Sequence, residues 1–169
     1  MTSPVSVRPA VPGDAATLAR LRYDLRAEMV HTAEQTSAFL ARCERWMRER
    51  LEDDALWRCW VAEQGGEVAG TIWLQIIEKI PNPLGEYEQH GYITNFFVRK
   101  GARGAGVGSA LLATLLGAGE TQRVDALILW PTERSRALYA RHGFAVRADV
   151  IERRPAAGPA QVDEPPRIP

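Results

Sequence analysis

The feature that most restricts the fold of this 169-residue chain is a glycine-rich turn between a strand-like segment and a helical one. Gly104, Gly106 and Gly108 follow the segment 92–98 and lead directly into an apolar helical pattern over residues 107–118. Glycines let a ligand approach the backbone closely, and the first amide groups of a helix have no acceptor within the helix. Such amides bind anions, so the turn predicts a site for a group such as pyrophosphate.

Three cations, Arg99, Lys100 and Arg103, add positive charge around this turn. The turn lacks the lysine–hydroxyl pair of a nucleotide P-loop, and its glycine spacing differs from the GxGxxG of dinucleotide-binding proteins. A dinucleotide fold also needs several consecutive β-α-β units, which the chain before residue 92 does not offer. A glycine-rich turn without a ligand remains the alternative.

The apolar pattern predicts strands and helices in the order β-α-α-β-β-β-α-β-α-β. Gln64-Gly65-Gly66 indicates a hairpin between two β-rich segments, and Asp14 is a favourable N-cap for the first helix. An antiparallel first half followed by a β-α-β crossover implies an α/β protein with a mixed sheet and helices on both faces. The expected strands are 5–8, 56–63, 67–77, 92–98, 125–130 and 144–153, and the expected helices are 15–29, 36–51, 107–118 and 133–142.

Composition is that of an ordinary globular protein, with 46% apolar residues, 25% charged residues and a formal net charge of zero. A zero net charge disfavours non-specific binding of nucleic acid. No segment reaches the roughly 20 apolar residues that a membrane span requires. The N-terminus lacks the pattern of a secretory signal, so we expect a cytoplasmic protein.

Cys43 and Cys59, the only cysteines, have neither CxxC spacing nor a histidine cluster near them. Reduced thiols are the favoured interpretation, with one disulfide as the alternative, and no metal site is expected. One domain is expected over residues 1–154. The tail, residues 155–169, holds five of the eleven prolines and is expected to be flexible.

Two motifs resemble those of the GNAT superfamily of N-acetyltransferases. Arg103-x-x-Gly106-x-Gly108 is similar to the family's Q/R-x-x-G-x-G/A motif, and the segment 130–144 resembles a later motif that ends in L-Y-x-x-x-G-F. The resemblance covers roughly residues 5–152 and implies a GNAT-like acyl-CoA N-acyltransferase fold. It further implies acetyl-coenzyme A as cosubstrate and transfer of its acetyl group to a primary amine through a tetrahedral intermediate.

The resemblance also implies which residues bind the coenzyme. The strand 92–98 and the strand 125–130 should splay apart and open a slot for the pantetheine arm. Thr132 stands where many members have asparagine, and we favour a role for it as the N-cap of the last helix. The residues expected at the coenzyme are Phe97, Val98, Arg99, Arg103, Gly104, Ala105, Gly106, Val107, Gly108, Ser109, Thr132, Ser135 and Tyr139.

For catalysis, the resemblance places Tyr139 as the general acid that protonates the leaving thiolate, and the Val98 amide as a donor to the oxyanion. Some members carry a glutamate on the strand 92–98 as general base, but this strand has no acid. Asn95 could orient the amine or a water molecule, and Glu88 is one candidate base just before the strand. A base acting through water, or an amine that binds in its neutral form, is equally open.

The acceptor is less constrained than the coenzyme. A small amine is preferred over a protein N-terminus or a lysine side chain, and the acidic bias of the loop 78–91 suits a cationic amine. A non-catalytic acyl-CoA sensor is the main alternative, and a nucleotide-binding module unrelated to acetyl transfer is a further one. Five tryptophans and apolar positions on the early helices leave a homodimer open.

Overall fold

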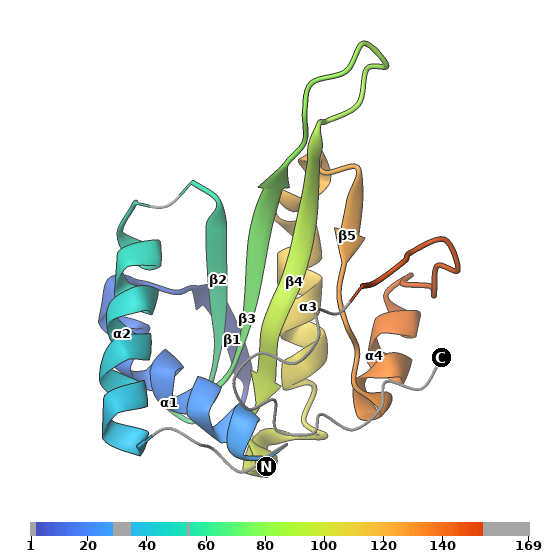
Figure 1. The fold of residues 1–169 in the computed structure, drawn as a ribbon. Coiled ribbons are helices and arrows are strands. Elements are labelled where there is room, and N and C mark those ends of the chain that lie inside the picture. Colours follow the sequence, from blue (N-terminus) through green and yellow to red (C-terminus); the bar gives the residue numbers. More distant parts are fainter. Residues whose placement is uncertain (1–2, 29–34, 54, 154–169) are drawn as a thin grey trace.

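The computed structural model describes residues 3–28, 35–53 and 55–153. Figure 1 shows a twisted sheet with α1 and α2 on one side and α3 on the other. The strands are β1 (Val5–Pro9), β2 (Trp57–Gln64), β3 (Glu67–Glu78), β4 (Gln89–Val98) and β5 (Ala126–Ile128), and the helices are α1 (Ala15–Ala27), α2 (Thr36–Asp53), α3 (Val107–Gly117) and α4 (Arg136–Arg141). The predicted α/β class and mixed sheet are therefore confirmed.

The sheet has the order β1-β2-β3-β4-β5, with antiparallel pairs throughout except for the parallel pair β4–β5. The predicted hairpin is confirmed, because Gly65 and Gly66 join β2 to β3 with φ of 62° and 83°. A two-residue hairpin turn with positive φ at both central positions matches the twist of the flanking strands, and glycine adopts positive φ without strain. The segment α3 supplies the single crossover, between β4 and β5.

The predicted last strand, 144–153, is wrong. Within the described part of the chain, residues 144–153 form neither strand nor helix and pair with no other strand. Val146 and Ile151, which alternation would have placed in the sheet, are 84% and 95% exposed. The predicted flexible tail, residues 155–169, lies outside the described residues.

Asp14 also differs from its expected role. A 3₁₀ turn, Pro12–Asp14, precedes α1, so Asp14 is already helical and does not cap the amides of α1 with its side chain. Its carboxylate instead accepts hydrogen bonds from the Val11 amide (2.8 Å) and from Arg8 (2.8 and 3.0 Å). Arg8 holds the pKa of the Asp14 carboxyl below its usual range.

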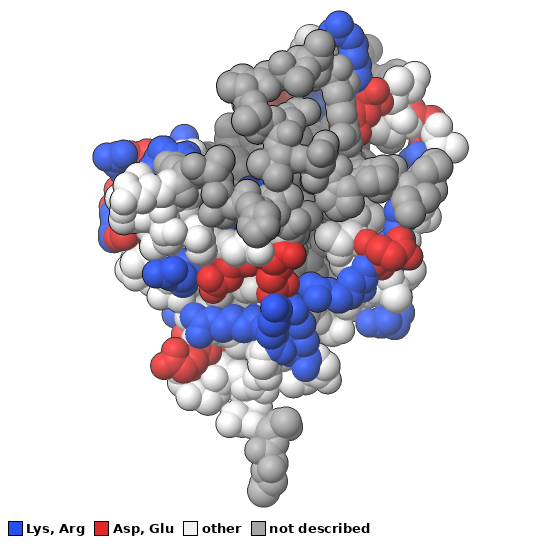
Figure 2. All heavy atoms as spheres, turned by 60° about the horizontal axis from the view of Figure 1, so that its bottom comes forward, with Lys and Arg blue, Asp and Glu red and all other residues white. Residues whose placement is uncertain are grey.

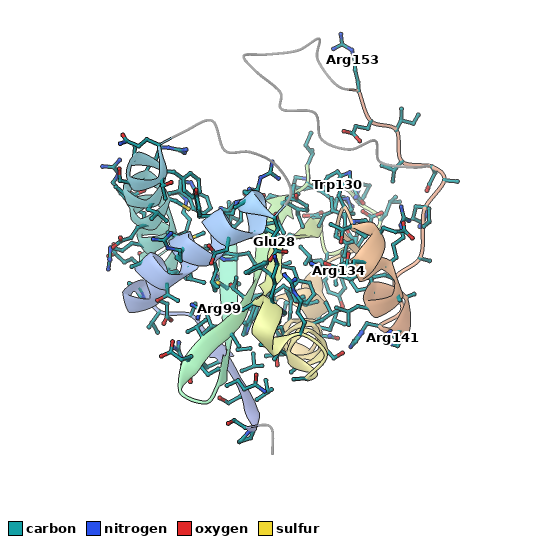
Figure 3. All side chains as sticks on the ribbon, turned by 90° about the horizontal axis from the view of Figure 1, so that it is seen from below. Glu28, Arg99, Trp130, Arg134, Arg141 and Arg153 are labelled. Atoms are coloured by element: carbon teal, nitrogen blue, oxygen red, sulfur yellow. The ribbon has the colours of Figure 1, made fainter. Side chains whose placement is uncertain are left out.

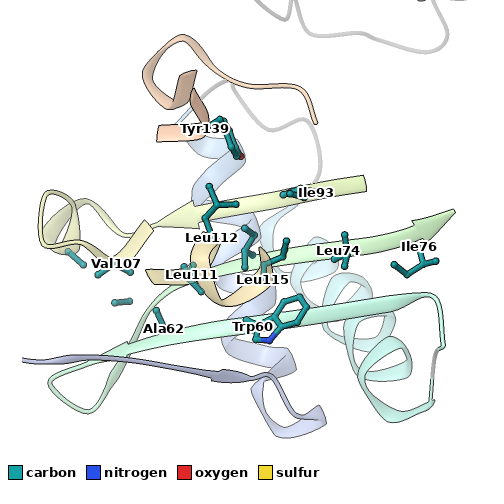
Figure 4. Close-up of a cluster of buried hydrophobic side chains, with 13 residues drawn as sticks. Trp60, Ala62, Leu74, Ile76, Ile93, Val107, Leu111, Leu112, Leu115 and Tyr139 are labelled. Carbon is teal, nitrogen blue, oxygen red and sulfur yellow. The ribbon is translucent and has the colours of Figure 1, made fainter. Parts of the chain in front are cut away.

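Two apolar clusters hold the helices on opposite faces of the sheet. On the α3 face, Leu111, Leu112 and Leu115 pack against β2, β3 and β4 in a cluster that includes Tyr139 (Figure 4). On the other face, α1 and α2 pack against the sheet around Leu18 and Trp73. The cleft described below opens where these two layers meet the ends of the central strands.

Most of the tryptophans, which suggested a possible homodimer, pack against other residues of the same chain. Trp46 of α2, Trp57 of β2 and Trp73 of β3 form one cluster, with ring centroids 5.1 to 6.1 Å apart. Trp60 is buried on the opposite face among the residues that pack on α3. Self-association therefore remains a prediction from the sequence. Cys43 and Cys59 are free thiols, as favoured above.

Candidate functional site

A cleft of about 650 Å³ opens where β4 and β5 diverge. The two strands pair only from His90–Ala126 to Tyr92–Ile128, and no pairing continues toward Val98 within the described chain. The cleft occupies this gap and reaches from α1 on one face of the sheet to α3 and α4 on the other. The splayed strands expected from the family resemblance are thus present.

A β-bulge in β4 bends the strand at the cleft. Thr71 pairs with Phe97 and Trp73 pairs with Thr94, so two residues of β4 lie opposite one of β3. Asn95, in the bulge, has φ of 48°, a left-handed conformation that non-glycine residues adopt at a cost. The bulge turns the Asn95 side chain toward α1, where its Oδ1 accepts a hydrogen bond from Arg22 (3.4 Å).

The glycine-rich turn lies at the wall of the cleft and leads into α3. Gly104 and Gly106 have φ of 78° and 83°, so both positions need the freedom of glycine. Gly106 is the N-cap of α3 and supplies no side-chain cap. Among the described residues, no side chain accepts a hydrogen bond from the first amides of this helix. The predicted anion site therefore has its amide donors available.

The end of β4 directs the Val98 amide into the gap. The Arg99 amide donates to the Ala69 carbonyl of β3 (2.9 Å). Successive residues of a strand direct their backbone groups to opposite edges, so the Val98 N–H and carbonyl point away from β3 and toward the gap. Consistent with this direction, the Val98 carbonyl accepts a hydrogen bond from Arg103 Nε (2.9 Å).

Phe97 differs from its expected role for the same geometric reason. Its backbone faces β3, and a Cβ added to Gly70 of that strand would lie 2.8 Å from the Phe97 carbonyl oxygen. Phe97 is among the residues that line the cleft, and the Arg103 guanidinium lies 5.6 Å from the centroid of its ring. Its backbone groups, which the resemblance placed at the coenzyme, are directed toward β3.

Tyr139 of α4 borders the cleft from the α3 face. Its ring packs edge-on against Phe96 (6.0 Å) and Phe144 (5.5 Å), and the side chain is buried. Burial, with a smaller contribution from Tyr92, raises the pKa of Tyr139 to about 12. The phenol is therefore protonated at any physiological pH and is able to donate a proton.

The Acetyltransferase (GNAT) family model matches residues 21–144, which include the cleft, the glycine-rich turn and α4. The chain belongs to the GNAT acetyltransferase family. A GCN5-related N-acetyltransferase from Ralstonia eutropha JMP134 is 28% identical, with a TM-score of 0.73 over 92% of this chain and 100% of that chain. A predicted acetyltransferase from Clostridium acetobutylicum, solved with acetyl-CoA, is 21% identical, with a TM-score of 0.74 over 89% and 96% of the two chains. A search of curated protein sequences gave no match.

Most residues expected at the coenzyme of a GNAT protein gather at this cleft. Arg99 and Ala105 are not among its lining residues. The expected residues that do line it are Phe97, Val98, Arg103, Gly104, Gly106, Val107, Gly108, Ser109, Thr132, Ser135 and Tyr139. The sequence pattern thus located one wall of the cleft.

Thr132 and Ser135 are engaged with each other. Thr132 is the N-cap of the 3₁₀ turn Glu133–Ser135 that leads into α4, as favoured above. The Ser135 hydroxyl accepts from the Thr132 amide (2.9 Å) and donates to the Thr132 carbonyl (2.9 Å). These bonds fix the start of α4 and so the position of Tyr139 beside the cleft.

Glu88 lies outside the cleft, at the opposite end of β4. Its carboxylate accepts a hydrogen bond from the Asn82 amide (2.9 Å), which holds the loop between β3 and β4. Lys79 pairs with Glu86 and with Asp125, and its hydrogen bonds, followed by its charge, lower the pKa of both carboxyls. The acidic bias of this loop is thus partly neutralised within the loop, and no residue of the loop lines the cleft. Asn95, in contrast, lies at the cleft as expected.

Four arginines that line the cleft from elements other than the glycine-rich turn were not predicted from the sequence. They are Arg22 and Arg26 of α1, Arg134 of the turn before α4, and Arg141 of α4. Figure 3 looks into this end of the molecule and shows Arg134 beside Glu28. Arginines on amphipathic helices normally belong to a solvated face, so neither spacing nor composition marked these residues.

Arg103 forms an ion pair across the cleft. Its Nη2 contacts both carboxylate oxygens of Glu28, just after α1, at 2.9 and 2.8 Å, and Arg134 lies 3.8 Å from the same carboxylate. The space-filling view in Figure 2 shows blue arginine and lysine atoms beside red acidic atoms on this face. Glu28 therefore connects α1 to the glycine-rich turn and to the start of α4.

In the ranges 3–28, 35–53 and 55–153, no three His, Cys, Asp or Glu side chains gather as metal ligands. None of the helices in these ranges is both long and apolar enough to span a membrane.

Proposed function

We propose that the chain transfers the acetyl group of acetyl-coenzyme A to the nitrogen of a primary amine. The observation that carries the proposal is the combination of uncapped amides at the start of α3 with a gap between β4 and β5 that leads from them to Tyr139. Backbone amides at a helix start suit a pyrophosphate, and a gap between strands suits an extended arm. Acetyl-coenzyme A supplies an acetyl thioester there.

The glycine-rich turn, the start of α3 and the end of β4 have distinct roles in this proposal. The amides of Val107, Gly108 and Ser109 bind the pyrophosphate, and Gly104 and Gly106 give the turn the conformation that exposes these amides. The Val98 amide, directed into the gap, donates a hydrogen bond to the acetyl oxygen as negative charge develops on it. Such a donor typically contributes about a hundredfold or more in rate.

Proton transfer follows from the burial of Tyr139. The amine nitrogen attacks the acetyl carbon to form a tetrahedral intermediate. This intermediate collapses with cleavage of the carbon–sulfur bond, and the electron pair of that bond remains on sulfur. The Tyr139 hydroxyl gives its proton to that sulfur, and the proton released by the nitrogen restores the phenol through water. The sum is an acetamide and the free thiol of the coenzyme.

The test is a screen of amines with purified protein and acetyl-coenzyme A, with thiol release as the readout. Melting temperature with and without coenzyme A measures cosubstrate binding separately, because stabilisation of the folded state by a ligand grows with the logarithm of its concentration over its dissociation constant. Stabilisation together with amine-dependent thiol release supports the proposal. No stabilisation by coenzyme A, or stabilisation by ATP or NAD alone, contradicts it.

A further inference from the structure

The face of α1 that borders the cleft carries two arginines. Arg22 and Arg26 are four residues apart, so they lie one above the other on the same side of the helix. Both line the cleft, together with Tyr92 and Asn95 of β4. Two cations side by side in a cleft repel each other, so their placement requires an explanation.

Neither arginine is neutralised by a carboxylate within the described residues. Arg22 has a single hydrogen bond there, from Nη1 to the neutral Asn95 Oδ1 at 3.4 Å, and Arg26 has no ion pair. Among the described residues that line the cleft there is no aspartate or glutamate, although Glu28 reaches Arg103 at its edge. Arg103, on the other wall, shows the contrast, because Glu28 pairs with it through both carboxylate oxygens.

The electrostatic environment of Arg22, like its contacts, indicates that the guanidinium charge is not compensated. Burial lowers the pKa of the Arg22 guanidinium, and the positive charge of Arg26 lowers it further. Both causes disfavour the charged form, and an anion that enters between the two side chains offsets them by pairing with the positive charges. An arginine binds carboxylate and phosphate oxygens well, since its planar fork offers paired N–H donors.

The position of the two arginines separates them from the pyrophosphate site. They approach the gap from the face covered by α1 and α2, whereas α3 and Tyr139 belong to the cluster on the opposite face. The pyrophosphate amides are at the start of α3. The anion that Arg22 and Arg26 receive is therefore carried by the molecule that enters from the α1 side, which is the acceptor.

We propose that the acetyl acceptor is a small primary amine that also bears a carboxylate or phosphate group, and that Arg22 and Arg26 bind this anionic group. This inference rests on the proposed function, because it specifies the second substrate of the same reaction. It replaces the cationic amine that the acidic loop 78–91 suggested, since that loop lies away from the cleft. Asn95 positions Arg22 through its Oδ1.

The experiment compares matched acceptors in steady-state kinetics. The pairs are ethanolamine with O-phosphoethanolamine, and glycinamide with glycine, so that each pair differs in the anionic group and the two pairs distinguish phosphate from carboxylate. We expect kcat/KM to be higher for the anionic member of at least one pair by about tenfold or more. Arg22→Gln should lower kcat/KM for that anionic acceptor by about 10- to 100-fold, mainly through KM.

Controls separate this effect from loss of the fold or of the coenzyme site. Arg22→Gln should leave the KM for acetyl-coenzyme A unchanged and lower kcat/KM for the neutral member far less than for the anionic member, and Arg22→Lys should retain part of the preference. Arg20→Gln, an exposed arginine of the same helix that does not line the cleft, should change neither value. Should Arg22→Gln lower the melting temperature severely, Arg26→Gln provides the same test.

Two outcomes would overturn the inference while leaving the proposed function intact. One is turnover of neutral or cationic amines with no preference for anionic members. The other is a preference that survives both Arg22→Gln and Arg26→Gln. If no amine is acetylated, calorimetric titration of the anionic members into protein saturated with coenzyme A decides: no binding overturns the inference, and binding lost in Arg22→Gln supports it. Failure of coenzyme A to bind at all contradicts the proposed function instead.

Discussion

The two walls of the cleft are built in different ways. The α3 wall offers backbone groups beside its side chains: two glycines with positive φ, the uncapped start of a helix and, from the end of β4, the amide of Val98. The α1 wall consists of side chains, above all Arg22 and Arg26. A site made of backbone amides can serve the same ligand in many proteins, whereas a site made of side chains can be changed by single substitutions. This difference fits a wall that holds a shared cosubstrate and a wall that selects an acceptor.

The largest effect is expected from Gly106→Val on the backbone-built wall. A β-branched residue at φ of 83° is strained by about 1–3 kcal/mol, so the turn should rearrange and misplace the first amides of α3. We expect coenzyme A binding to weaken by more than about a hundredfold in calorimetry. Gly101→Ala is the matched control, because Gly101 has open space for a Cβ and an ordinary φ. Equal binding in both variants would show that the turn does not hold the coenzyme.

The next largest effect is expected from Tyr139→Phe, which removes the proton donor and keeps the ring. We expect kcat to fall by about 10²-fold or more with coenzyme A affinity retained, because general acid catalysis contributes about 10²–10⁴-fold. Tyr87→Phe, an exposed tyrosine of the β3–β4 loop, is the control. An unchanged kcat in Tyr139→Phe would assign the ring to packing alone.

The wild-type protein gives a pH test of the same residue. Because burial raises the pKa of Tyr139 to about 12, its ionisation should not limit the rate below that pH, and any rise in rate near neutrality should report loss of a proton by the amine. The stability that this neutral phenol contributes is present below its unfolded pKa of about 10 and is lost as the pH rises from there toward 12. Chemical denaturation at several alkaline pH values, with Tyr139→Phe for comparison, measures that loss.

A smaller effect is expected from Glu28→Gln, where the two walls meet. Removing the carboxylate frees Arg103 for the pyrophosphate, so we expect coenzyme A to bind about two- to fivefold more tightly, while stability falls by at most about 1 kcal/mol. Glu44→Gln, which removes the ion pair with Arg48 on α2, is the control for stability. Weaker coenzyme A binding in Glu28→Gln would mean that the ion pair supports the site rather than competing for it.

The smallest effect is expected from Glu88→Gln. Glu88 lies at the far end of β4 and accepts a hydrogen bond from the Asn82 amide, so we expect less than about a twofold change in kcat/KM. The pH profile with the best acceptor is measured alongside. If the rate of this variant no longer rises with pH, the general base lies on the β3–β4 loop. The acceptor would then depend on a residue outside both walls of the cleft.

The amino-acid sequence by itself determined the parts that depend on local chemistry. Glycine spacing and the following helical pattern located the start of α3, and Gly65-Gly66 located the hairpin, because positive φ is almost confined to glycine. Thr132 is the expected N-cap of the turn that leads into α4 for a similar reason, since capping contacts reach only a few residues.

Only the tertiary structure decided what depends on a distant partner. The alternating segment 144–153 resembles a strand, but a strand exists only where another offers hydrogen bonds, and among the described residues none does. Glu88 directly precedes β4 and Asn95 lies within it, only seven residues later. The extended strand nevertheless separates Glu88 from the cleft that Asn95 borders. Arg22 and Arg26 resemble surface residues until the packing of α1 on β4 places them at the gap. Long-range packing and strand pairing set these positions, and neither is encoded in the spacing of nearby residues.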